Sequence, residues 1–173
     1  MQRVKIKIAI FITLLMAGNA LAQTTNYKTY AVVLYSFTKY IEWPVESKQG
    51  DFVIAVFGNS KMASELQNSM VGRKVGTQLV RIVEAKSLSE LSDAQVIFVG
   101  DLKSGSTAEV VALTKSKPVL VVTERDGLVK KGACVSFLVT DDGLLKFQLN
   151  DQALSDQRLK AASALTALAY RGS

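Results

Sequence analysis

Hydrophobic and polar residues follow two different periods along the chain, and the change of period marks the predicted elements. Residues 26–43 repeat apolar side chains every three or four positions, which predicts a helix. Pro44 ends it, because the residue before a proline is disfavoured in the α region. This helix is apolar over most of its circumference, so it is either sandwiched in a core or leaves apolar surface for a partner.

Short apolar runs rich in Val, Ile and Phe predict strands, and helical segments lie between them. The predicted strands are 51–57, 77–83, 95–99 and 118–123, and the predicted helical segments are 61–70, 87–91 and 106–115. Strands that alternate with helices are typical of βαβ units and a parallel sheet.

The C-terminal part has a different pattern. Runs 133–140 and 144–149 flank Asp141-Asp142-Gly143, and an Asp-Gly turn between two such runs predicts a β-hairpin. We expect one last helix to begin at Asn150 or Ser155, since both residue types cap helices. The expected fold is therefore α/β: a single-domain three-layer sandwich whose mostly parallel sheet carries a C-terminal β-hairpin and a final helix.

The first residues predict a cleaved secretory signal peptide. Three basic residues precede the apolar run 8–17, and Ala20-Leu21-Ala22 supplies the small residues at which a signal peptidase cuts. The apolar run is shorter than the roughly 20 residues that a bilayer span needs, which argues against a retained anchor. The expected organisation is a signal peptide at residues 1–22 and one domain at residues 23–173, located in the periplasm.

Charge and residue types narrow the functional class. Three of the 21 Lys and Arg lie in the predicted signal peptide, which leaves 18 against 15 Asp and Glu. The mature part has no basic block, so we expect no nucleic-acid partner. No histidine is present, which excludes Ser-His-Asp and Cys-His catalysis and removes the commonest transition-metal ligand. We expect no enzyme activity, no metal and no cofactor.

Cys134 is the only cysteine, so the chain cannot form an internal disulfide. It lies in the apolar run 133–137, which favours a small buried hydrophobic residue over a reactive thiol. Pairing of Cys134 between two chains is the alternative in an oxidising compartment.

Several segments together carry a resemblance to a known family. They are an aromatic helix closed by Trp43-Pro44, the strands 53–58 and 94–99, a block with Gly132, Val135-Ser136-Phe137, Asp142-Gly143, Phe147 and Asn150, and a helical segment with Leu159, Ser163, Leu165, Leu168 and Ala169. In this order behind a predicted signal peptide, nearly the whole mature chain resembles the YfiR-like family.

The resemblance implies a small periplasmic α/β protein that tends to dimerise and is not an enzyme. The best-known member represses an inner-membrane diguanylate cyclase by binding its periplasmic part, and an outer-membrane lipoprotein sequesters this repressor. That member has paired cysteines, whereas this chain has one, and Ala94 stands where the family often has cysteine. Redox control through a disulfide is therefore not carried over.

Aromatic residues of the first helix are candidates for partner binding. They are Tyr35, Phe37, Tyr40 and Trp43, and tryptophan in particular is enriched at interface hot spots. A helical aromatic stripe is more often part of a core than of an interface, and both roles stay open. With the resemblance, these residues predict docking onto the extracytoplasmic domain of a membrane sensor, a diguanylate cyclase or a histidine kinase.

The alternative function is a periplasmic sensor module that binds a small molecule. Asn59, Ser60 and Asp101 follow neighbouring predicted strands, and ligands of open α/β sheets bind at the carboxyl ends of strands. Capping and turn formation are the ordinary roles of such residues, and both alternatives stay open. Asp141 and Asp142 are interpreted as solvated turn residues.

Overall fold

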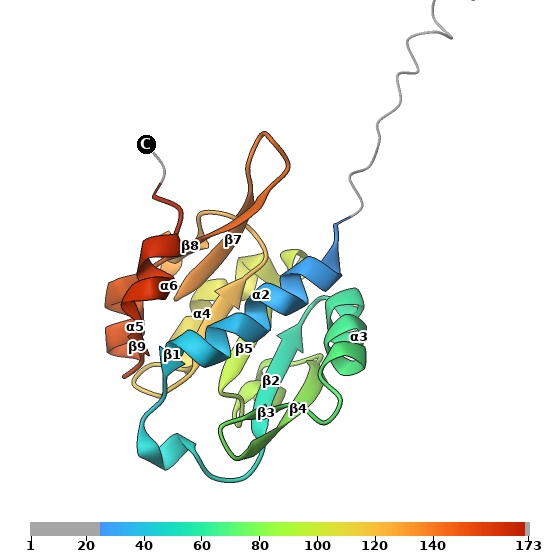
Figure 1. Cartoon of the computed structure of the whole chain (residues 1–173), viewed down its shortest axis with the longest axis vertical. Helices are drawn as coiled ribbons and strands as arrows, with labels where there is room; N and C mark the ends of the chain where they lie inside the picture. The colour runs from blue at the N-terminus through green and yellow to red at the C-terminus, as the bar shows by residue number, and fades with distance from the viewer. Residues whose placement is uncertain (1–24, 172–173) are drawn as a thin grey trace, which may run out of the picture.

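A seven-stranded mixed sheet forms the middle layer of the computed structural model, which describes residues 25–171 (Figure 1). The strand order is β3-β4-β2-β5-β6-β7-β8. Strands β4, β2, β5, β6 and β7 are parallel, and β3 and β8 are antiparallel additions at the two edges. The strands are β2 (Phe52–Phe57), β3 (Lys74–Val75), β4 (Gln78–Ala85), β5 (Val96–Val99), β6 (Leu120–Thr123), β7 (Val135–Val139) and β8 (Leu145–Leu149).

Helices cover both faces of this sheet, which confirms the expected α/β fold. Helix α2 crosses one face with α3 beside it, and α4 lies on the opposite face (Figure 1). The helices are α2 (Tyr27–Tyr40), α3 (Ser60–Ser69), α4 (Thr107–Leu113), α5 (Asp151–Asp156) and α6 (Ser163–Leu168). Short 3-10 helices span Val45–Ser47, Leu88–Leu91, Asp101–Ser106 and Leu128–Lys131.

The core is divided in two by the sheet, because successive side chains of a strand point to opposite faces. Along β2, Ile54 and Val56 belong to the cluster under α2, whereas Ala55 and Phe57 belong to the cluster under α4. Phe137 of β7 is the centre of the α2 side. Its ring lies 4.9 Å from that of Tyr30, 5.8 Å from that of Phe37 and 6.4 Å from that of Phe98.

The first helix is shorter than expected. It ends at Tyr40, and Ile41 and Glu42 form the short strand β1 (Ile41–Glu42). This strand pairs antiparallel with β9 (Lys160–Ala161), so that Ile41 faces Ala161 and Glu42 faces Lys160. Pairing with a distant segment therefore ends the helix before Pro44 does.

The expected single final helix is wrong in detail. Asn150 does cap α5, since its side-chain oxygen accepts a hydrogen bond from the Ala153 N–H at 2.9 Å. The helix then stops, and Arg158 adopts a left-handed conformation with φ of 55°. Strand β9 and the separate helix α6 follow. The buried Leu159 packs into the α2-side cluster, so tertiary packing overrides the local helical pattern.

The predicted signal peptide, residues 1–22, lies outside the described residues. Within residues 25–171, no helix combines the length and hydropathy that a membrane crossing requires.

Candidate functional site

Glu124 connects three elements at the carboxyl edge of the parallel strands. Its Oε2 atom accepts hydrogen bonds from Asn59 Nδ2 and from the backbone N–H of Asp101, each at 2.8 Å. Its Oε1 atom accepts one from the Tyr27 hydroxyl, also at 2.8 Å. Asn59 and Asp101 therefore lie together, as the ends of neighbouring parallel strands should. Glu124, which the sequence analysis did not single out, is the group that joins them.

The three ligand candidates at this edge are occupied by contacts within the chain. Asn59 Oδ1 accepts the Met62 N–H at 2.9 Å and caps α3. Asp101 Oδ1 pairs with Arg125 Nε at 2.7 Å, and Ser60 donates a hydrogen bond to Glu84. The cap made by Asn59 is one of the ordinary roles that the sequence left open. Ligand binding by Asn59, Ser60 and Asp101 stays a prediction.

Burial and the Glu124 carboxylate hold two nearby tyrosines in the neutral form. Burial is the main cause that raises the pKa of Tyr30 to about 12, and the charge of Glu124 adds to it. Burial also raises the pKa of Tyr27, with Asn59 opposing and Glu124 reinforcing the shift. At neutral pH the Tyr27 hydroxyl is therefore protonated and able to donate to Glu124.

The four aromatic candidates divide into two buried and two surface residues. Phe37 and Trp43 are 1% and 6% exposed, which is the burial of core residues. Phe37 packs edge-on against Phe147 with ring centres 5.1 Å apart. In this conformation a partner can reach Tyr35 and Tyr40, so direct contact with a partner stays a prediction for these two.

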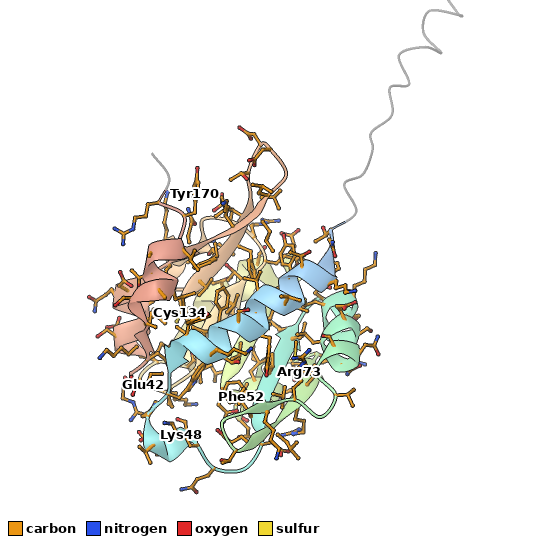
Figure 2. The ribbon with its side chains drawn as sticks, viewed as in Figure 1. Glu42, Lys48, Phe52, Arg73, Cys134 and Tyr170 are labelled. Atoms are coloured by element: carbon orange, nitrogen blue, oxygen red, sulfur yellow. The ribbon has the colours of Figure 1, made fainter. Side chains whose placement is uncertain are left out.

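Tyr35 lies under a small group of cations. Lys39 Nζ lies 5.0 Å from the Tyr35 ring centre, and the Arg73 guanidinium lies 5.1 Å from it. The Tyr35 hydroxyl donates a hydrogen bond to the Lys74 carbonyl oxygen at 3.1 Å. Figure 2 shows Arg73 beside α2, between this helix and α3. Tyr35 therefore fastens α2 to the β3 edge. Lys39 and Arg73 give the surface around it a positive charge.

Tyr40 borders an apolar groove between α2, β8 and α6. The groove has a volume of about 410 Å³. We call it the α2–α6 groove, and its lining residues include Val33 and Tyr40 from α2, Leu145 and Phe147 from β8, and Leu168 from α6. Tyr40 is 43% exposed and Leu168 is 67% exposed. Grouped exposed apolar side chains on a small domain mark interaction sites more often than isolated ones do.

The only cysteine of the chain is buried. Cys134 is fully buried, and burial is the main cause that raises the pKa of its thiol to about 11. Between residues 25 and 171, no group of three or more Cys, Asp or Glu side chains is arranged to hold a metal ion.

Comparison with known protein families identifies the family to which the chain belongs. The model of the YfiR/HmsC-like family matches residues 27–170, so the chain belongs to that family. The matched segment contains α2, the Glu124 network and the α2–α6 groove. Among curated proteins, no match was found. Membership confirms the resemblance seen in the sequence and implies a regulatory protein of the periplasm that acts with a membrane signalling protein.

Proposed function

We propose that this protein is a periplasmic regulator that binds the extracytoplasmic domain of an inner-membrane diguanylate cyclase and holds the cyclase in a less active state. The observation that carries the proposal is the family match over residues 27–170. A binding protein shifts a receptor between two states only if it binds them with unequal affinity. The regulator then needs a complementary surface and no reacting groups of its own.

The α2–α6 groove is the proposed docking surface. Tyr40 and Leu168 stand at its border, while Phe37 and Phe147 are buried below and support it. Exposed aromatic and aliphatic anchors over a rigid, buried base are the arrangement of interface hot spots. Release by an outer-membrane lipoprotein would follow if that lipoprotein covers the same groove.

Site-specific cross-linking tests this surface. A photoreactive amino acid is placed at position 40 or 168, and the adducts are recovered from membranes and identified by mass spectrometry. The matched control carries it at Leu102, which is 88% exposed and lies outside the groove. We expect a diguanylate cyclase in the adducts from positions 40 and 168 only. Adducts that contain no membrane signalling protein would contradict the proposal.

Cellular cyclic di-GMP gives a functional readout. Tyr40→Asp and Leu168→Asp each add a charge to the apolar groove, so we expect repression to weaken and cyclic di-GMP to rise. Leu102→Asp adds the same charge elsewhere and should leave the level unchanged. Thermal melts of the three variants separate lost binding from lost folding. Equal cyclic di-GMP in all strains, with all variants folded, would be evidence against repression through this groove.

A further inference from the structure

A group of exposed cations lies on the side of α2 that faces β3. Lys28 and Lys39 are about three helical turns apart, which places them on one side of the helix. Arg73 reaches the same side, because its guanidinium and the Lys39 ammonium group both contact the Tyr35 ring (Figure 2). Lys74 follows Arg73, and its carbonyl oxygen accepts the Tyr35 hydroxyl. We call these four exposed cations, Lys28, Lys39, Arg73 and Lys74, the basic surface.

The basic surface and the α2–α6 groove lie on different sides of the same helix. The groove takes Val33, Ser36 and Tyr40 from the exposed part of α2, whereas Lys28 and Lys39 do not line it. Positions three or four apart along a helix share a side, and these two sets follow two separate rows. A partner on one surface therefore leaves the other surface accessible.

The charges of the basic surface are not neutralised by ion pairs within residues 25–171. The three ion pairs of that part of the chain lie elsewhere and include none of the four cations. Arg73 Nε donates to the Ser69 carbonyl oxygen at 2.9 Å, and this neutral acceptor leaves the guanidinium charge in place. The Tyr35 ring holds Lys39 and Arg73 by cation–π contacts, which also leave their charge in place. The positive charge of this surface is therefore open to an anion from outside the chain.

Two aliphatic side chains protrude among these cations. Val32 is 58% exposed and lies between Lys28 and Lys39 on α2. Val71 is 82% exposed and stands at the turn after α3, beside Gly72, whose φ of 68° suits a tight turn. Long lysine and arginine stems can keep their charges at the level of lipid headgroups while a neighbouring apolar side chain goes deeper. This combination fits the boundary between headgroups and acyl chains of a bilayer.

We propose that the basic surface binds the anionic phospholipid surface of a bilayer. Lipid phosphate groups pair with the four cations, and Val32 and Val71 enter the headgroup boundary. An acidic polypeptide would satisfy the same charges, but isolated aliphatic side chains that protrude between long cationic side chains favour a lipid surface.

Binding to a bilayer would hold the protein at the surface on which a membrane receptor is found, with the α2–α6 groove still accessible. The search for the receptor is then confined to two dimensions, which raises the local concentration of the regulator. The inference does not depend on the identity of the receptor, and its test uses lipids alone.

Vesicle flotation tests the proposal. The mature protein is mixed with vesicles of equal parts phosphatidylglycerol and phosphatidylcholine, and in parallel with vesicles of phosphatidylcholine alone. We expect binding to the mixed vesicles, little binding to the neutral ones, and loss of binding as added salt screens the charges. No binding to the mixed vesicles at low salt, or equal binding to both kinds, would overturn the proposal.

Paired variants locate the surface. Lys39→Gln combined with Arg73→Gln removes two charges from the basic surface and should weaken binding to the mixed vesicles about thirtyfold, the effect of two cations near an anionic membrane. Lys115→Gln combined with Lys130→Gln removes two charges from the cleft between α4 and α5 and should change binding little. Thermal melts check that both proteins fold. Equal losses would show that net charge alone drives binding and would refute the site.

A polarity-sensitive fluorescent label separates a bilayer from an acidic polypeptide. The label is attached to Val71→Cys and, as the control, to Ala112→Cys, because Ala112 is exposed on α4 on the opposite face of the sheet. The native Cys134 is buried and should not take up the dye. We expect a blue shift on the mixed vesicles for the label at position 71 only. A blue shift with poly-glutamate and none with the vesicles would assign the surface to an acidic polypeptide and overturn the proposal.

Discussion

The Tyr27 hydroxyl donates a hydrogen bond to Glu124 Oε1 at 2.8 Å, across 97 positions of sequence. The other oxygen of Glu124 holds Asn59 and the backbone of Asp101. One carboxylate therefore fastens the first turn of α2 to the ends of β2, β5 and β6. Because α2 also carries one side of the α2–α6 groove, this contact fixes the helix that presents the proposed docking surface.

Tyr27→Phe should lower the free energy of unfolding by about 1–2 kcal/mol, because a partly buried hydrogen bond to a charged group is lost. Urea denaturation measures the change. A double-mutant cycle with Glu124→Gln isolates the pair, and we expect the two effects to be less than additive. Strict additivity would show that the hydroxyl and the carboxylate do not interact in solution.

Alkaline pH should destabilise the fold through Tyr30. Its pKa is about 12 in the folded chain against the ordinary 10.0, so the folded state favours the neutral phenol. The stabilisation is complete below pH 10 and is lost as the pH rises toward 12. Urea denaturation at a series of pH values checks this. Tyr30→Phe, which cannot ionise, should lose less stability than the wild type between pH 9 and pH 11. Equal losses in both proteins would contradict the shifted pKa.

Gly100→Ala should destabilise the carboxyl edge of the sheet. An added Cβ would lie 2.6 Å from the Cβ of Asn59 and 2.7 Å from the Gly58 carbonyl oxygen, and backbone cannot move aside easily. We expect a loss of about 1–3 kcal/mol, typical of overpacking. Gly105→Ala is the control, because nothing lies within 4 Å of its added Cβ. Thermal melts that show the same change for both variants would argue against tight packing at Gly100.

The Cys134 thiol should be unreactive in the native protein. It is fully buried and its pKa is about 11, so the thiolate that attacks disulfide reagents is scarce at neutral pH. We expect slow labelling by an aromatic disulfide reagent without urea and rapid labelling of the same protein in denaturing urea. Rapid labelling of the native state would reveal an opening near β7. It would also favour the alternative in which Cys134 forms a disulfide between two chains.

Local patterns predicted much of the fold because side-chain period and turn chemistry act over short distances. The apolar run that forms β2 and the Asp142-Gly143 turn both lie where the sequence indicated. The meeting of Asn59 and Asp101 followed from a topological rule, since neighbouring parallel strands end at one edge. These features need no knowledge of the distant chain.

Other features depend on contacts that no local pattern carries. Glu124 stands among charged residues after a strand and resembles a solvated turn residue, yet its partners come from three other segments. The final helix breaks because Leu159 is buried and the next residues pair with β1. The α2–α6 groove joins residues from both ends of the domain, so the pattern of α2 indicated apolar surface without indicating what lies beside it.

The pairing of β1 with β9 has a consequence for the order in which the chain can fold. Residue 41 is made long before its partner, residue 161, and the Ala162 N–H also binds the Tyr40 carbonyl oxygen at 2.8 Å. A chain that emerges from its N-terminus has α2 ready first, but the strands that bury it arrive later. The β2 and α3 segments cover part of its apolar face early, but the part that packs on Phe137 and Phe147 stays uncovered until β7 and β8 have appeared. We therefore expect folding to be completed only after nearly the whole domain has been released.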